Sequence, residues 1–115
     1  MISHKINIHF ILKNKKHIFV AKMNIKKLKD IRKKIDKLDV KILNIVKKRT
    51  ILVNEVIKTK QYKNQIVDNI RIKKVLNNIK QLSKKKKIDT KITNKIWTTM
   101  INSYIDYERR NFKKK

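Results

Sequence analysis

The chain has 115 residues and a formal net charge of +26, from 34 Lys and Arg against 8 Asp and Glu. It contains no Gly, Pro or Cys, which excludes a disulfide framework, a thiolate metal site, a cysteine nucleophile and a glycine-rich phosphate loop. The longest uncharged run, residues 96–105, is about half as long as a membrane-spanning helix, so we expect one small domain that does not enter a membrane.

The excess of positive charge has two explanations. One is a polyanionic partner such as nucleic acid, which attracts basic proteins. The other is an A/T-biased genome, because Lys, Ile and Asn supply over half of the chain and all three have A/T-rich codons. The cations are scattered, and the longest unbroken run, at residues 84–87, has only four residues. We therefore expect no nucleic-acid partner and keep that class as a rival.

Residues 1–22 differ in pattern from the rest of the chain. Residues 6–10 alternate between apolar and polar types, and residues 14–16 could turn into a second extended run at 17–20. This predicts a weak hairpin or an irregular arm. All three His lie in this segment without Cys or carboxylate neighbours, so we expect no metal site. We treat residues 1–22 as an N-terminal extension without an assigned function.

A long amphipathic helix is predicted from the N-cap residue Asn24 to about Lys60. Its apolar residues recur at alternating steps of three and four: Leu28, Ile31, Ile35, Leu38, Ile42, Ile45, Leu52 and Val56. Such a helix would be about 55 Å long. A monomer of 115 residues cannot cover a stripe of that length, so we expect pairing with a second copy.

Two shorter helices follow in the sequence. After a loop at residues 61–67, Asp68 is a candidate N-cap for the second helix, and after a polar connection at residues 84–87, Asp89 is a candidate N-cap for the third. The third helix fades near Phe112. The expected fold is all-α, with one very long and two short helices, and with the long helix paired to that of a second copy.

Arg49 interrupts the apolar stripe at a position where Leu or Ile is expected. A guanidinium in an apolar seam requires an anionic partner, which is a structural carboxylate or a ligand. Lys60 follows eleven residues later and points within about 20° of Arg49, whereas Arg32 points about 100° away. Arg32 could reach the same pocket only from a second chain. Two Arg and one Lys that converge in an apolar seam suit a small dicarboxylate.

Three segments together resemble the all-helical class of chorismate mutase. The first is Arg32-x-x-Ile35-Asp36-x-Leu38-Asp39-x-x-Ile42-Leu43-x-Ile45-Val46-x-x-Arg49-x-x-Leu52-x-x-Glu55-Val56-x-x-x-Lys60, the second is Asp68-x-x-Arg71, and the third is Ile96-Trp97-x-x-Met100-Ile101-x-x-Tyr104-Ile105-x-x-Glu108. The similarity implies an intertwined helical homodimer, with a chorismate mutase-like domain at residues 23–112 and a basic tail at residues 113–115. It implies an isomerase that rearranges chorismate to prephenate without a cofactor or metal, in aromatic amino-acid synthesis through the shikimate pathway in the cytoplasm.

The resemblance also implies roles for individual residues. Arg49 and the partner subunit's Arg32 would bind the two carboxylates of chorismate, and Lys60 would bind a carboxylate and the ether oxygen. Glu108 stands where the family has Gln or Glu and would donate to the same oxygen when protonated. Asp68 would line the site near the substrate hydroxyl. Lys60, Glu108 and Arg49 are therefore the candidate catalytic residues.

Two positions depart from the family pattern. Ile72 replaces a Glu that contacts the substrate hydroxyl, and Tyr104 stands at a substrate-binding position where many relatives have a smaller residue. Three alternatives to a chorismate mutase remain open on the sequence. They are an isochorismate pyruvate lyase, a basic helical nucleic-acid-binding protein and an inactive remnant of the fold.

Overall fold

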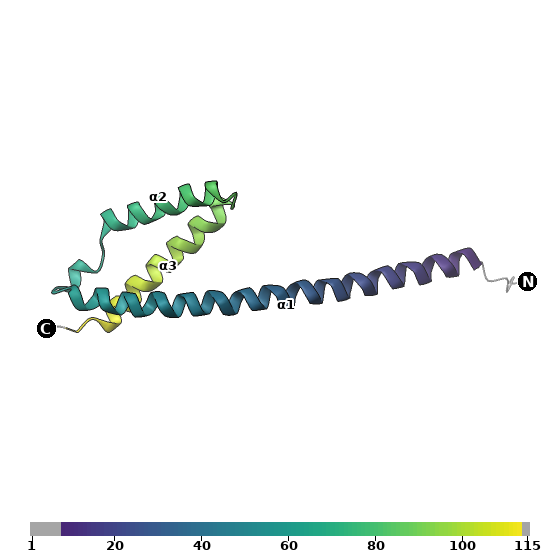
Figure 1. Ribbon diagram of the computed structural model, residues 1–115, viewed down its shortest axis with the longest axis horizontal. Coiled ribbons are helices and arrows are strands. Elements are labelled where there is room, and N and C mark those ends of the chain that lie inside the picture. Colours follow the sequence, from purple (N-terminus) through teal and green to yellow (C-terminus); the bar gives the residue numbers. More distant parts are fainter. Residues whose placement is uncertain (1–7, 114–115) are drawn as a thin grey trace, which may run out of the picture. The chain divides into compact units, whose positions relative to one another are not determined.

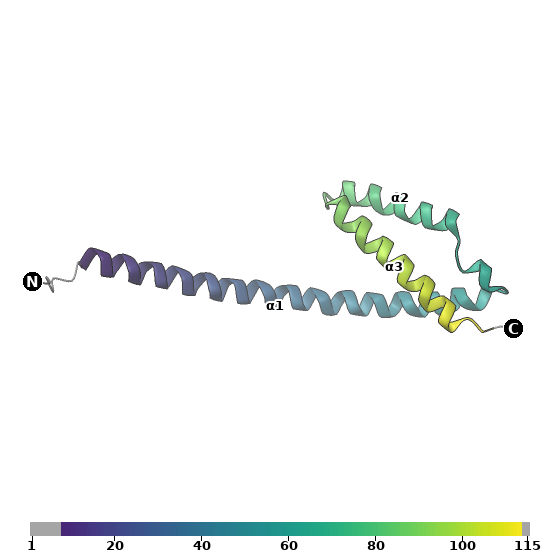
Figure 2. The same ribbon diagram turned by 180° about the vertical axis from the view of Figure 1, so that it is seen from behind.

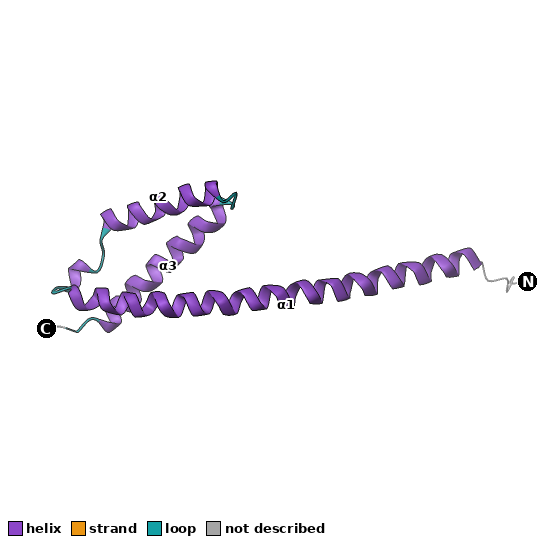
Figure 3. Cartoon of the chain, in the orientation of Figure 1, coloured by secondary structure: helices purple, strands orange, loops and turns teal. Residues whose placement is uncertain are grey.

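The computed structural model describes residues 8–113 of the chain, with side chains from residue 14 onward. It contains three α-helices, α1 (Ile8–Thr59), α2 (Asn69–Lys85) and α3 (Thr90–Asn111), and a short 3₁₀ turn, η1 (Lys63–Gln65), between α1 and α2. The described part of the chain has no strand (Figure 3). The all-α prediction is confirmed. None of the helices within these residues has an apolar stretch that could cross a bilayer.

α1 contains 52 residues, so it rises about 78 Å along its axis. The prediction of one very long helix is confirmed, and its C-terminal end at Thr59 lies one residue from the expected end. Its beginning was predicted wrongly, because Asn24 lies inside the helix and is not its N-cap.

The hairpin or irregular arm predicted for the N-terminal extension is also wrong over residues 8–22, which are helical. Two short strands without a third strand are marginal at best. Continuing an existing helix, in contrast, adds one backbone hydrogen bond for each residue that is ordered. The chain also has no Gly or Pro to stop the helix there. The rest of the predicted arm, residues 1–7, lies outside the described part.

The chain divides into two compact units, residues 1–46 and 47–115. In the first unit, every side chain that the structure describes, from residue 14 to residue 46, is exposed. This includes the apolar stripe, in which Ile35 and Ile42 are 50% and 56% exposed. The first unit therefore covers none of its described apolar residues by itself.

Both short helices in the second unit begin at the predicted N-caps. The Asp68 carboxylate accepts a hydrogen bond from the Arg71 backbone N–H at 2.9 Å, and the Asp89 carboxylate accepts one from the Lys91 N–H at 2.8 Å. Each cap satisfies a backbone donor that the helix itself leaves without a partner. These two Asp residues therefore set where α2 and α3 start.

A tight turn joins α2 to α3. Lys87 has a φ of 57°, in the left-handed region that usually favours Gly. The Lys87 N–H donates to the Lys84 carbonyl at 3.1 Å, and the Ile88 N–H donates to the Ser83 carbonyl at 2.8 Å. This pair of bonds defines a Schellman motif, which ends α2 and reverses the chain.

Two pairs of polar side chains join α3 to the last turns of α1 within the second unit. Tyr104 Oη and Thr50 Oγ1 are hydrogen bonded at 2.7 Å, and Tyr107 Oη donates to Asn54 Oδ1 at 2.7 Å. Figures 1 and 2 both show α3 running from the turn after α2 to this end of α1. At its other end, α3 is bonded to α2 through the buried hydroxyls of Ser83 and Thr93, 2.8 Å apart.

The apolar core of the described residues is small. Only Ile57 and Ile66 are buried hydrophobic side chains, at 8% and 3% exposure. Ile57 lies two turns after Thr50 on the face of α1 that meets α3. The second unit is therefore an open arrangement of three helical segments around a cavity.

Candidate active site

A cavity of about 420 Å³ lies among the three helical segments of the second unit. The end of α1, the connection to α2, the first turns of α2 and the last turns of α3 all contribute to its lining. The lining residues are Arg49, Leu52, Val53, Val56, Lys60, Ile66, Asp68, Arg71, Ile72, Val75, Ile101, Tyr104, Ile105 and Glu108. Most of this wall is aliphatic, and the charged groups are interspersed within it.

Arg49 enters the cavity from α1 and lies against an aromatic ring of α3. Its guanidinium carbon is 4.5 Å from the centroid of the Tyr104 ring. A cation over the face of a tyrosine ring is attracted by the negative potential of that face. Arg49, expected from the interruption of the stripe, is thus half-buried and directed at the cavity.

Lys60 immediately follows the last residue of α1. Its ammonium group donates to the backbone carbonyl of Ile66 at 3.3 Å, and Ile66 is one of the two buried apolar residues. This bond holds the Lys60 side chain against the connection between α1 and α2. Because an ammonium carries three protons, two further donors remain for a ligand in the cavity.

Glu108 is the buried carboxyl of the site, at 8% exposure. Burial raises its pKa above the ordinary value for Glu, although the positive charges of Lys60 and Arg49 act in the opposite direction. Desolvation is the larger effect because it disfavours the ionised form. The protonated fraction of Glu108 is therefore increased, and a protonated carboxyl can donate a hydrogen bond.

The wall formed by α2 contains a cation that the sequence did not single out as a site residue. Arg71, one turn into α2, lines the cavity together with Asp68 and Ile72. The spacing in the sequence could have identified Arg71 as a lining residue. It lies three residues after the N-cap Asp68 and therefore near the same face of the helix. Ile72 presents an aliphatic side chain where the family pattern has a carboxylate.

Five of the six predicted site residues line this one cavity: Arg49, Lys60, Asp68, Tyr104 and Glu108. The sixth, Arg32, belongs to the first unit, is exposed and is not among the lining residues. The structure describes a single chain, so the expectation that Arg32 acts from a second chain stays a prediction.

The donors in this cavity suit an anionic organic ligand. Three cations, the carboxylate of Asp68 and the raised-pKa carboxyl of Glu108 lie among aliphatic lining residues. No cluster of three or more His, Cys, Asp or Glu that could hold a metal ion occurs among the residues that the structure describes. A cavity of this kind can orient a small carboxylate compound and stabilise negative charge that develops on it.

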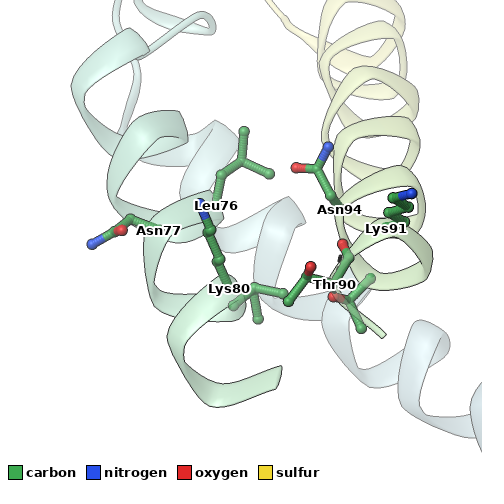
Figure 4. A pocket seen from close by; sticks show the side chains of 8 residues that line it. Leu76, Asn77, Lys80, Thr90, Lys91 and Asn94 are labelled. Atoms are coloured by element: carbon green, nitrogen blue, oxygen red, sulfur yellow. Dashed lines mark hydrogen bonds between the residues drawn. The ribbon is translucent and has the colours of Figure 1, made fainter. Parts of the chain in front are cut away.

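A second cavity, of about 390 Å³, lies between α2 and α3 near their connecting turn. Figure 4 shows Asn94 extending from α3 toward α2, whereas Asn77 points away from α3. Its lining consists of Leu76, Asn77, Ile79, Lys80, Thr90, Lys91, Thr93 and Asn94. None of these eight residues is acidic or was predicted as a site residue, and we assign this cavity no function.

The fold and the first cavity define an all-helical protein with a cavity in which cations stand among aliphatic residues. The family model for chorismate mutase type II matches residues 31–109. The chain belongs to this family, whose members are isomerases acting on chorismate. It matches no curated protein and no solved structure.

Proposed function

We propose that the Arg49–Glu108 cavity binds chorismate and rearranges it to prephenate, in a homodimer whose second subunit contributes Arg32 to each site. The observation that carries this assignment is the convergence of Arg49, Lys60 and the buried Glu108 on one aliphatic cavity. We place the reaction in phenylalanine and tyrosine synthesis in the cytoplasm.

The first task of the site is to hold a flexible dianion in its folded, reactive conformer. Arg49 offers the planar fork of donors that suits a carboxylate, and the partner subunit's Arg32 would bind the other carboxylate. Arg71 supplies a further cation at the cavity wall. The aliphatic residues of the lining exclude water and strengthen these charge interactions.

The second task is to stabilise negative charge on the ether oxygen as its bond to the ring breaks. Lys60 and protonated Glu108 are the two donors for this oxygen in the proposal. The rearrangement is concerted and transfers no proton, so the site needs no nucleophile or general base. Preorganised donors of this kind act by electrostatic stabilisation of the transition state.

The exposed stripe of α1 supports the homodimer. Apolar residues at helical spacing remain exposed from Leu28 to Val56, and only Ile57 and Ile66 form a buried apolar core within the described residues. A second copy is the simplest surface with a matching stripe. It would also bring Arg32 into a site that its own helix cannot serve, because Arg32 and Arg49 point about 100° apart.

The activity is tested by following the loss of chorismate absorbance with purified protein. We expect turnover in the unchanged chain, and a fall of about 100-fold or more in kcat/KM for Arg49→Ala and for Lys60→Ala. Arg109→Ala and Lys47→Ala are matched controls, because both residues are exposed and neither lines the cavity. Both controls should stay within about twofold of the unchanged chain.

Unchanged turnover in the Arg49 and Lys60 variants would contradict the assignment. Pyruvate release from isochorismate, without turnover of chorismate, would instead identify a lyase. Binding of DNA that weakens steeply with salt, again without turnover, would favour the nucleic-acid-binding class.

The shared site is tested by subunit complementation. Arg32→Ala and Lys60→Ala should each inactivate a homodimer, and mixing them with subunit exchange should restore about a quarter of the activity, because half of the dimers then hold one intact site. If each site uses residues of a single chain, no mixture restores activity. This outcome would disprove the shared site without affecting the assignment of the reaction.

A further inference from the structure

The side chain of Arg49 is supported by Tyr104, the residue that departs from the family pattern toward a larger side chain. The guanidinium carbon lies 4.5 Å from the centre of the Tyr104 ring. The two residues come from different helices and both line the cavity. The ring is therefore in a position to determine where the guanidinium lies before any ligand binds.

The Tyr104 ring is itself held in place from two directions. Its hydroxyl is hydrogen bonded at 2.7 Å to Thr50, the residue next to Arg49 on α1. The Tyr107 ring meets it edge-on, with ring centroids 6.2 Å apart and an angle of 82° between the planes. A ring bonded through its hydroxyl and in T-shaped contact with a second ring has little freedom to turn away from the guanidinium.

An aromatic support differs chemically from a carboxylate support. A structural carboxylate beside Arg49 would occupy N–H donors and compete with an anionic ligand for them. A ring attracts the charge of a guanidinium through its face and has no carboxylate oxygens to pair with the forked N–H donors. The guanidinium also keeps its full charge, which an ion pair would offset.

We propose that Tyr104 is a positioning residue for Arg49: its ring, anchored by Thr50, holds the guanidinium so that its donors face a carboxylate of the substrate. The effect that we expect of Tyr104 on turnover rests on the proposed function. The geometry itself exists without substrate, so the two can be tested separately.

The first test is NMR of the ligand-free protein. The side-chain protons of Arg49 next to the guanidinium should be shifted by the ring current of Tyr104, and this shift should disappear in Tyr104→Leu and remain in Tyr104→Phe. Arg49 signals that are identical in the unchanged chain and in Tyr104→Leu would overturn the proposal. Because no turnover is needed, this result is independent of whether the chain acts on chorismate.

The second test is kinetic. Loss of the ring in Tyr104→Leu should raise KM for chorismate by about five- to tenfold, with a smaller change in kcat. Tyr104→Phe keeps the ring and loses the bond to Thr50, so its KM should rise less than about threefold.

Tyr107→Leu is the comparison variant for the kinetic test. It removes the same atoms from the same helix, and a hydrogen bond of the same length, to Asn54, but Tyr107 does not line the cavity. It also removes the ring contact to Tyr104 but leaves the Tyr104 ring and its bond to Thr50, so KM should rise less than in Tyr104→Leu. A rise in KM for Tyr107→Leu equal to that for Tyr104→Leu would overturn the proposal, because general loosening of α3 would then explain both.

A double-mutant cycle isolates the route through Arg49. Lysine has no planar face to lie on a ring, so in an Arg49→Lys background Tyr104→Leu should change KM by less than about twofold. An undiminished effect in that background would show that Tyr104 acts on the substrate by another route, and would overturn the proposal.

Discussion

The two units of this chain use the same helix in opposite ways. Along residues 14–46, every described side chain of α1 is exposed. Along residues 47–59, one face of α1 is covered by α3, through the bonds of Thr50 and Asn54 to two tyrosines. Apolar spacing alone therefore does not decide whether a helical face is buried.

The covered face is not the apolar stripe. Leu52 and Val56, which continue the stripe, are 60% and 46% exposed, whereas Ile57 is buried. The face bonded to α3 is rotated by about 160° from Leu52 and Val56 and includes the polar residues Thr50 and Asn54. Within one chain, α1 is bonded to α3 through its mixed face, and Leu52 and Val56 line the cavity. The part of the stripe before residue 47 has no cover in its own unit.

The difference between the two parts of α1 can be tested by placing a charge in the exposed stripe, and this change is expected to have the largest effect on association and activity. Ile42→Asp should abolish the proposed dimer, because an uncompensated carboxylate in the apolar seam between two subunits would cost about 3 to 5 kcal/mol. Sedimentation velocity and circular dichroism would show loss of the dimer together with loss of helix. Activity should fall in parallel.

The control is Asn44→Asp, which introduces the same side chain two residues away. Asn44 is also exposed, but it points about 160° away from Ile42 and is not part of the stripe. Its dimer should be as stable as that of the unchanged chain. If both variants remain dimeric, the stripe is not the interface.

An effect of intermediate size is expected from the titration of Glu108, which lies in the second unit. Burial raises the pKa of this carboxyl, so it binds its proton more tightly in the folded chain than in the unfolded chain. Activity that needs the protonated donor is complete below the raised pKa and is lost as pH rises through it, by about tenfold for each further pH unit. The tighter binding of this proton also stabilises the folded chain. That stabilisation is complete below the pKa of Glu108 in the unfolded chain and is lost as the pH rises through its raised pKa in the folded chain.

Glu108→Gln sharpens this prediction because an amide donates a hydrogen bond at every pH. The variant should keep activity at low pH and show no decline between pH 5 and 9, as measured by kcat/KM profiles of both proteins. A flat profile for the unchanged chain would contradict the role of Glu108 as a protonated donor.

The smallest effect is expected at the turn after α2. Lys87 has a positive φ of 57°, which costs a residue with a Cβ about 1 kcal/mol. Lys87→Gly should therefore raise the free energy of unfolding by about 0.5 to 1 kcal/mol, measured by urea denaturation. Lys86→Gly, at the neighbouring position with a φ of −86°, should not be stabilising. A loss of stability in Lys87→Gly would contradict this account of the turn.

Local signals in the sequence predicted most of the helix boundaries. Asp68 and Asp89 cap α2 and α3 as expected, because an N-cap depends on a side chain and a backbone N–H only two or three residues apart. Asn24 failed as an N-cap because a capping residue starts a helix only where the preceding residues do not continue it. Here residues 8–23 are already helical.

The site could be predicted in part. Arg49 and Lys60 were recognisable because a cation within an apolar helical stripe is unusual and their directions follow from helical geometry. Glu108 and Tyr104 came only from the resemblance to a family. The cavity lining by Arg71 and the bond between Thr50 and Tyr104 were missed, since both depend on how separate helices pack.

The sequence by itself determined the all-α class, the long apolar stripe and two helix caps, because these depend on neighbours within a few residues along the chain. It also determined the family, because that match compares residue types position by position over residues 31–109 and needs no contacts. Only the tertiary structure decided which face of α1 meets α3, that Arg49 lies over the Tyr104 ring, and that burial raises the pKa of Glu108 against two nearby cations. The physical reason is that contacts and desolvation depend on residues more than fifty positions apart in the chain, which helical periodicity does not relate.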